Sequence, residues 1–247
     1  MISIKSDREI KLMKEAGRHL RDTFKYIEKY VKAGITTKEL DKLIYDYIIK
    51  SGCNPSCLGY EGYPASSCMS INDEVVHGIP SKRKLKNGDI VSIDLVLNYK
   101  GYHADATRTF IIGNVDEKIK NLVQDTKDAF YAGLSKVKEG AKVKDISLAI
   151  ENYAHSHGLS VVEELCGHGI GLSMHEEPDI CNFNNGCNIR LKAGMVIAIE
   201  PMLNLGSKKV YFDEDGWTVR TMDGLPSCHY ENTVLVTKEG YEILTGD

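Results

Sequence analysis

The sequence predicts an α+β fold of two similar halves, with helices on one side of a curved antiparallel sheet. The first indication is an internal repeat, because residues 31–52 and 137–158 share seven of 22 positions at an offset of 106. At the same offset, residues 87–94 overlay residues 193–200. The third indication is an order of two helices followed by strands that occurs twice, which favours α+β layering. A long period that is used only twice does not indicate a solenoid of short repeats.

The first half begins with two predicted helices. We expect one from Ser6 or Asp7 to about Val31, because its apolar residues recur at helical spacing. The second is capped by one of the threonines at 36–37 and ends at Gly52. An irregular stretch rich in Gly, Pro, Ser and Tyr follows, and two strands close the half, over residues 89–99 and 103–113.

The second half repeats this order. Its predicted helices cover about residues 116–137 and 143–156, and its strands lie near 160–166, 194–202, 208–213, 217–222 and 228–237. No low-complexity linker separates the halves. We therefore expect one domain over residues 1–247, made of halves of about 1–115 and 116–247.

Composition argues against several classes of protein. An apolar content of 42% suits a globular chain, and a net charge of −4 provides no overall basic field for nucleic acid. No apolar run approaches the roughly 18 residues of a membrane helix. The charged N-terminus lacks a signal core, so a cytoplasmic protein is expected. In that reducing compartment most of the seven cysteines would be thiols, and no C-x-x-C pair occurs to indicate a structural zinc site.

Two acidic residues of the first half are predicted to face each other. Asp94 and Asp105 would be directly opposed on adjacent strands if Tyr99 and Lys100 form the centre of a tight turn. Opposed carboxylates repel, and a cation between them reverses the sign of that interaction. The alternative is that Asp105 lies on a solvated face and binds nothing.

The second half offers a matching acidic pair. Glu200 and Glu231 would be opposed across a longer, interrupted hairpin centred on Asp215-Gly216, a dipeptide that strongly indicates a hairpin turn. Glu200 lies in the otherwise apolar segment VIAIEPM, where an unpaired carboxylate is costly to bury. Each half would then present one acidic pair on its sheet.

Three histidines strengthen the prediction of a metal site. His168 lies between glycines in CGHGIG, His77 has a similar setting in VHGIP, and His175 follows in MHEEP. A single histidine is more often an ordinary polar residue than a ligand. Three of them beside four carboxylates favour a two-metal site that accepts Co, Mn, Fe or Zn. In such a site carboxylates and a water bridge the metals, and the water becomes hydroxide near neutral pH.

These residues match a known family. The chain resembles a type I methionine aminopeptidase of the short bacterial form, in peptidase family M24, over nearly its whole length. The matching segments are CLGYEGYP, SINDEVVHGIP, DIVSIDL, GYHADATRTF, CGHGIG, HEEP, IEPM, DGWTVRT and YENTVLVT. The resemblance implies a pita-bread fold and a single catalytic domain. It also implies hydrolytic removal of the initiator methionine from nascent proteins and peptides with a small second residue.

The resemblance implies a role for each proposed ligand. Asp94 would chelate one metal, and Asp105 and Glu231 would bridge both. His168 and Glu200 would complete the other metal. Glu200 would also act as the general base toward the bridging water.

Substrate contacts are implied in the same way. His175 would hydrogen-bond the scissile carbonyl or its developing oxyanion, and His77 would contact the substrate beyond it and help the leaving amine. A sulfur-lined apolar pocket suits a thioether side chain. Its matching residues, with Met202 nearby, are Cys57, Tyr60, Tyr63, Cys68, Met174 and Trp217.

The chain departs from the family pattern at the pocket rim. Position 61 is Glu where relatives often carry His, and position 174 is Met where an aromatic is expected. Both differences bear on substrate preference rather than on the chemistry. Backbone carbonyls around Asn72 and Glu74, with Ser227, match a site for a monovalent cation, Na or K, in relatives.

Two alternatives remain open from the sequence. One is an X-Pro aminopeptidase or prolidase of the same fold, which usually carries an extra N-terminal domain. The other is a non-catalytic peptide-binding pseudoenzyme, although such proteins typically lose ligands and all five are present here. The short interval 177–199 excludes the helical insertion of a type II enzyme. The expected partner is the N-terminal Met of nascent polypeptides, with ribosome contact plausible for that task, and a monomer is the default.

Overall fold

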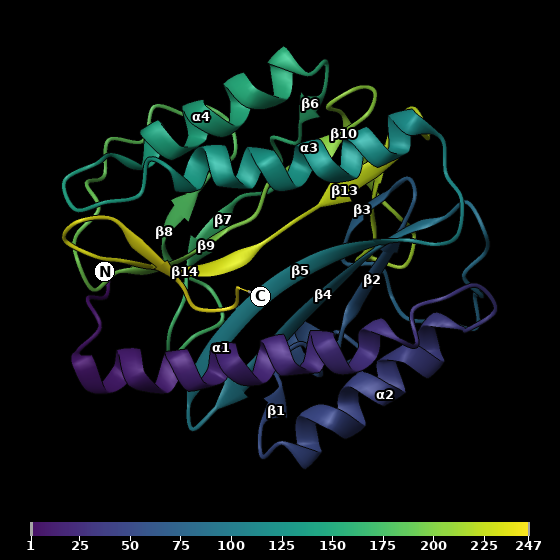
Figure 1. The fold of residues 1–247 in the computed structure, drawn as a ribbon, viewed down its shortest axis with the longest axis horizontal. Coiled ribbons are helices and arrows are strands. Elements are labelled where there is room, and N and C mark those ends of the chain that lie inside the picture. The colour runs from purple at the N-terminus through teal and green to yellow at the C-terminus, as the bar shows by residue number, and fades with distance from the viewer. Residues whose placement is uncertain (1, 247) are drawn as a thin grey trace.

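The structure, a computed structural model, describes residues 2–246 and contains four α-helices within that range. They are α1 (Asp7–Glu28), α2 (Thr37–Lys50), α3 (Glu117–Leu134) and α4 (Val143–Ser156). Figure 1 shows α3 and α4 above the strands and α1 and α2 below them, so the strands occupy the middle of the molecule.

Capping boxes explain where the first two helices begin. The Ser6 amide donates to the Glu9 carboxylate at 2.7 Å, and the Thr36 amide donates to the Glu39 carboxylate at 2.8 Å. Each box satisfies amides that no helical carbonyl can reach. Both predicted starts are confirmed, and α1 ends at Glu28, slightly before the predicted end.

All strands pair antiparallel, and in the described range they form four sheets. The first half contributes β1 (Asn54–Pro55), β2 (Cys68–Ile71), β3 (Glu74–Val76), β4 (Ile90–Tyr99) and β5 (Tyr102–Ile111). The second half contributes β6 (Ser160–Val161), β7 (Gly167–Gly169), β8 (Glu176–Ile180), β9 (Val196–Ile199), β10 (Met202–Asn204), β11 (Val210–Phe212), β12 (Val219–Thr221), β13 (Ser227–His229), β14 (Asn232–Val236) and β15 (Tyr241–Ile243).

Several short strands differ from the prediction. The stretch predicted to be irregular contains β1 and β2, and β7, β8 and β15 were not predicted. The strand expected over 160–166 is only the two residues of β6, and the segments 194–202 and 228–237 each split into two strands. These strands have five residues or fewer, too few for an alternating pattern to stand out.

The internal repeat is a structural repeat. The limits of α4 are those of α2 displaced by the sequence offset. An isolated bridge between Thr36 and Lys84 recurs at the same offset between Lys142 and Arg190. Both bridges fix the start of the second helix of a half to the segment that leads into its central strand, so the two halves share a construction as well as a sequence pattern.

Each helix pair covers one face of the strands of its own half. In β4, Ile93 and Leu95 pack into one apolar core with α1 and α2, whereas Asp94 and Val96 line a cavity on the opposite face. In β9, Ile197 packs with α3 and α4 in the second core. The predicted layering is therefore confirmed, and the face without helices is left for the site.

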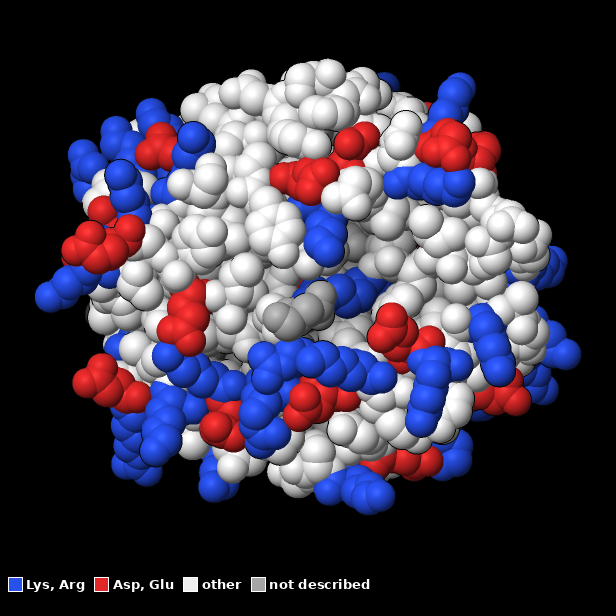
Figure 2. Space-filling model, in the orientation of Figure 1, with Lys and Arg blue, Asp and Glu red and all other residues white. Residues whose placement is uncertain are grey.

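Charged side chains of both signs are interspersed on the face shown in Figure 2, in keeping with the small net charge of −4. Among the helices of residues 2–246, none is both long enough and apolar enough to cross a bilayer.

One pair of cysteines departs from the expectation of thiols. Cys166, just before β7, and Cys181, just after β8, form a disulfide. Gly167 of β7 is opposite Ile180 of β8, and the two cysteines are the next residues outward on each strand. The other five cysteines are free, as expected: Cys53, Cys57, Cys68, Cys187 and Cys228.

Candidate metal centre and adjoining cavity

The β4–β5 hairpin carries the first two carboxylates, in a register that corrects the predicted one. The turn is centred on Lys100 and Gly101, whose φ angles of 51° and 94° suit a two-residue hairpin turn. Asp94 is therefore opposite Thr107, and Asp105 lies two residues before Thr107. Because the shift is two residues, both carboxylates stay on one face, as diagonal neighbours instead of a directly opposed pair.

The second pair of carboxylates lies where a ladder is interrupted. β9 pairs with β14 up to Ile199 and Asn232, and the same register resumes between β10 and β13 and between β11 and β12, up to the Asp215-Gly216 turn. The predicted register is therefore correct. Glu200 and Glu231 are the next pair after Ile199 and Asn232, but neither belongs to a strand. Because the ladder is interrupted at these two residues, their side chains can approach the first half.

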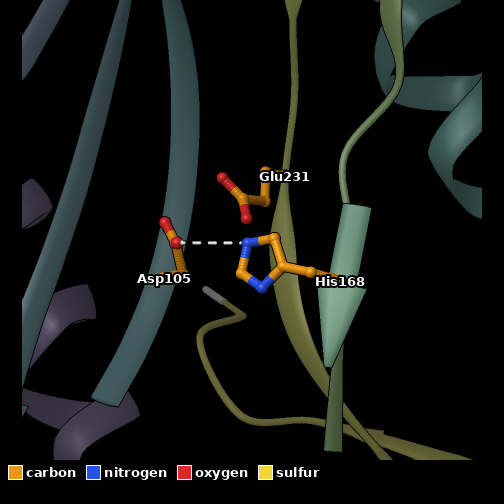
Figure 3. A group of neighbouring side chains, drawn as sticks. All are labelled: Asp105, His168 and Glu231. Carbon is orange, nitrogen blue, oxygen red and sulfur yellow. Dashed lines mark ion pairs between the residues drawn. The ribbon is translucent and has the colours of Figure 1, made fainter. Parts of the chain in front are cut away.

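Three side chains converge between the two halves, as Figure 3 shows. One ligand atom each of Asp105, His168 and Glu231 lies within 4.8 Å of the others. The His168 Nε2 atom is 3.8 Å from Asp105 Oδ2 and 3.5 Å from Glu200 Oε1. Asp105, His168 and Glu231 are 4%, 8% and 1% exposed, so water can hydrate them little. A buried set of one imidazole and several carboxylates has the donor types of a site for a transition metal.

The carboxylates of this cluster lack partners that a cation would supply. Asp94 Oδ1, Asp105 Oδ1 and Glu231 Oε1 are buried with no hydrogen bond from any described residue. Burial raises the pKa of Asp94 to about 6. Burial, followed by repulsion from neighbouring carboxylates, raises the pKa of Asp105, Glu200 and Glu231 well above the ordinary range. These residues therefore fit a bound divalent metal, which would favour their ionised forms.

The local backbone fixes the tautomer of His168. Its Nδ1 atom lies 2.8 Å from the Gly169 carbonyl oxygen, so Nδ1 carries the proton and the Nε2 lone pair faces the carboxylates. Burial lowers the pKa of His168 to about 3, which keeps the ring neutral. A Cβ atom at Gly169 would overlap the Glu177 carbonyl, and one at Gly167 would overlap the Ala198 carbonyl. The glycines of CGHGIG are thus needed for close approach of the neighbouring chain segments.

Hydrogen bonds across the seam between the halves hold the carboxylates. Thr107 Oγ1 donates to Glu231 Oε2 at 3.0 Å, and the Glu231 amide donates to the Thr107 carbonyl at 3.2 Å. The Asp105 amide donates to Thr233 Oγ1 at 2.9 Å, and that hydroxyl donates to the Asp105 carbonyl at 2.8 Å. Sequence reasoning missed Thr107, although its position two residues after Asp105 places it on the same face of the strand.

A cavity of about 420 Å³ opens onto the carboxylates. Six of its residues with aromatic rings or sulfur belong to one apolar cluster, in which the Tyr63 and Trp217 rings meet edge to face with centroids 5.0 Å apart. All residues predicted to line a methionine pocket line this cavity: Cys57, Tyr60, Tyr63, Cys68, Met174 and Trp217. The cavity therefore joins an apolar end to a polar, acidic end.

Three further histidines line the cavity. The His175 ring meets His168 edge to face, with centroids 4.3 Å apart. His77 has a φ of 60°, and burial, with His175 contributing less, lowers its pKa to about 4. His229 Nε2 lies 3.7 Å from Glu200 Oε2. The two histidines predicted to contact substrate thus line the same cavity as the acidic cluster.

The residues suggested for a monovalent cation also lie close together. The Ser227 amide donates to the Asn72 carbonyl at 2.9 Å. Glu74 lies two residues after Asn72 in the sequence, and its carboxylate accepts a hydrogen bond of 2.8 Å from the Ile71 amide. One of the carbonyls suggested as a ligand is therefore already engaged by an amide, and binding of Na or K there stays a prediction.

Comparisons with known proteins agree with this geometry. The sequence profile of metallopeptidase family M24 matches residues 11–238. The methionine aminopeptidase of Clostridium perfringens is 46% identical over 246 residues, which cover 99% of each chain. The crystal structure of methionine aminopeptidase from Rickettsia prowazekii has a TM-score of 0.98 at 42% identity and covers 100% of both chains.

A more distant similarity concerns the fold alone. The prolidase from Pyrococcus horikoshii has a TM-score of 0.78 at 24% identity, and the match covers 98% of this chain but 63% of that one. The predicted pita-bread fold is thereby confirmed. The profile match and the cluster of Asp105, His168 and Glu231 together support the use of a divalent metal. The chain belongs to metallopeptidase family M24.

Proposed function

We propose that this protein is a methionine aminopeptidase, which hydrolyses the bond after the N-terminal methionine of nascent proteins and peptides with a small second residue. The observation that carries the proposal is the position of an apolar, sulfur- and aromatic-lined chamber directly beside the carboxylates and His168. A methionine side chain suits the chamber. Its own carbonyl would then lie at the acidic end.

Five side chains would hold two divalent metal ions. Asp94 would chelate one, His168 and Glu200 the other, and Asp105 and Glu231 would be shared. Donors of this mixed type accept Co, Mn, Fe or Zn. When bound, the ions would polarise the scissile carbonyl and lower the pKa of a bound water so that it can attack.

The chain itself would move the protons. Glu200 is the proposed general base, because its carboxylate lines the cavity next to His168. Burial and the charge of Glu231 raise the pKa of Glu200 in the metal-free protein. Bound metal would favour the ionised carboxylate, which could then accept the proton of water and pass it to the leaving amine. His175 would donate a hydrogen bond to the carbonyl oxygen as negative charge develops there. His77 would contact the peptide beyond the scissile bond and assist the leaving amine.

Specificity would arise at the apolar end and at its rim. Cys57, Tyr60, Tyr63, Cys68, Met174 and Trp217 would surround the methionine side chain. Glu61 and Met174, where relatives carry other residues, would modify the preference for the residues that follow methionine. A monovalent cation, Na or K, would bind near Asn72, Glu74 and Ser227.

The substrate class indicates where in the cell the protein would act. We infer a cytoplasmic monomer that acts on the N-terminal Met of nascent polypeptides at or near the ribosome, with no part played by a membrane or a specific nucleic acid. Both halves would supply ligands to one centre, so residues 1–247 would act as a single catalytic domain.

A pair of peptides tests this function against its nearest alternative. The protein, loaded with Co, Mn, Fe or Zn, is given Met-Ala-Ser and Ala-Pro, and free amino acids are measured. Release of methionine from the first peptide is expected. Release of proline from the second would assign the chain to the X-Pro enzymes, and no turnover with any metal would favour a peptide-binding pseudoenzyme.

A substitution tests the general base. Glu200→Gln keeps the size of the side chain but removes its basic oxygen, so kcat should fall at least about 100-fold. Metal content, measured by atomic emission, separates loss of the base from loss of a ligand. A near-normal kcat would rule out the proposed role of Glu200.

A further inference from the structure

Tyr60 links the two ends of the cavity. Its ring packs against the buried apolar cluster that includes Cys57 and Met174. Its hydroxyl lies 2.8 Å from Nδ1 of His175, and the two rings meet edge to face with centroids 5.4 Å apart. His175 in turn meets His168 at 4.3 Å between centroids. A chain of direct contacts therefore runs from the apolar end to the candidate metal centre.

The backbone that carries Tyr60 is a closed turn. The Tyr60 amide donates to the Cys57 carbonyl at 3.0 Å, the Tyr63 amide donates to the Tyr60 carbonyl at 2.8 Å, and the Gly59 amide donates to the Tyr63 carbonyl at 2.9 Å. The φ angles of 83° at Gly59 and 47° at Glu61 allow the chain to turn this tightly. The Tyr60 hydroxyl is thus presented to His175 from a fixed position.

Either partner of this contact can be the donor, because a phenol can both donate to and accept from a neutral imidazole. Burial raises the pKa of Tyr60, so its phenol keeps a proton to donate at neutral pH. A neutral imidazole that accepts at Nδ1 carries its own proton on Nε2. His168 has the opposite arrangement, because its Nδ1 faces the Gly169 carbonyl at 2.8 Å. Two adjacent histidines would then hold opposite tautomers, one with a lone pair on Nε2 and the other with a proton there.

We propose that Tyr60 is a positioning residue that holds His175 as the Nε2–H tautomer and so couples methionine recognition to polarisation of the scissile carbonyl. The inference rests on the proposed function. A methionine side chain in the apolar end would pack against the Tyr60 ring. The same side chain that recognises methionine would thus orient the group that donates to the methionine carbonyl.

Kinetics separate this role from that of a plain pocket wall. Tyr60→Phe keeps the ring and removes only the donor, so kcat for Met-Ala-Ser should fall about tenfold while KM changes less than about twofold. Combining it with His175→Ala should lower kcat no further than His175→Ala alone, because the two residues act through one contact. Tyr45→Phe, on the exposed surface of α2, is the matched control and should behave as wild type. Unchanged kcat, or a rise in KM alone, in Tyr60→Phe would overturn the proposal.

A spectroscopic measurement reads the tautomer without turnover. In the zinc-loaded protein, ¹⁵N shifts of His175 should show an unprotonated Nδ1 and a protonated Nε2, and Tyr60→Phe should move both shifts toward a mixture of tautomers. Identical His175 shifts in the two proteins would contradict the role of Tyr60. If the wild type releases no methionine while the tautomer still depends on Tyr60, the positioning role stands and the proposed function fails.

Discussion

The Thr107 hydroxyl donates a hydrogen bond to the Glu231 carboxylate, 3.0 Å away, across the seam between the two halves. The backbone closes the same contact, since the Glu231 amide donates to the Thr107 carbonyl at 3.2 Å. Glu231 lies in the break between β13 and β14, so its position depends on β5 of the other half as well as on its neighbours in sequence. The geometry of the candidate metal centre therefore depends on how the two halves dock.

Thr107→Val should weaken metal binding. The substitution preserves shape and removes the donor to Glu231, and loss of a residue that orients a ligand typically costs about tenfold or more in affinity. Isothermal titration with Mn²⁺ measures the change. Thr126→Val is the control, because Thr126 is equally buried and its hydroxyl donates to the Leu122 carbonyl within α3. Equal affinities in the two variants would mean that the Thr107 hydroxyl does not orient a ligand.

Gly169→Ala should displace His168. The new Cβ would overlap the Glu177 carbonyl, a backbone atom that cannot rotate away, so β7 must shift from β8. We expect a loss of about 2 kcal/mol or more in the free energy of unfolding and a weaker affinity for metal. Chemical denaturation and metal titration test both. Gly240→Ala, where nothing lies within 4 Å of the added Cβ, is the control, and matching stability in the two variants would refute the close approach.

The metal-free protein should lose stability as pH rises. Burial raises the pKa of Asp94 to about 6, above its ordinary value of about 4, so the protonated form is favoured by the fold. The stabilising contribution of Asp94 is fully present below about pH 4 and is lost as pH rises through about 6. Melting temperatures in chelator between pH 4.5 and 7.5 should therefore fall more steeply for wild type than for Asp94→Asn. Parallel curves of melting temperature against pH in the two proteins would contradict the raised pKa of Asp94. Added metal should raise the melting temperature of the wild type most at the upper end of the pH range.

Removing the disulfide should destabilise the protein. The bond between Cys166 and Cys181 closes a loop with a sequence separation of 15 residues, for which about 2–4 kcal/mol of stabilisation is typical. Cys181→Ser should lose that amount in non-reducing buffer and should match wild type once a reductant is present. Cys187→Ser, at a free and half-buried cysteine, should change little. A wild type that is insensitive to reductant, with no cross-linked peptide by mass spectrometry, would show that the bond does not form.

The sequence repeat gave a correct account of the architecture because helices of this length carry their own signals. A capping threonine located the start of α2, the repeat located α4, and the offset between them proved to be structural. The same local signals failed for the shortest strands. β7 and β8 have three and five residues and include glycine and proline, so they are strands because β7 pairs with both β8 and β9.

The residues of the two hairpin turns explain why one predicted register was correct and the other was wrong by two residues. The Asp215-Gly216 signal placed the second-half register correctly, as the pairing of β11 with β12 shows. In the first half the turn uses Lys100 and Gly101 instead of Tyr99 and Lys100, because both central positions need a positive φ and glycine supplies one of them. The error was two residues, which kept both carboxylates on the predicted face but turned a facing pair into a diagonal one.

By itself the sequence determined the two-fold repeat, the main helices and strands, the five candidate ligands and six apolar residues that line the cavity, since these follow from local pattern and from resemblance. Only the tertiary structure decided which groups meet: Thr107 with Glu231, Tyr60 with His175, and Cys166 with Cys181. Each hydrogen-bonded pair joins residues more than a hundred positions apart, and the disulfide joins two short strands that the sequence did not reveal. Such contacts depend on how strands end and how the halves dock, which no local pattern encodes.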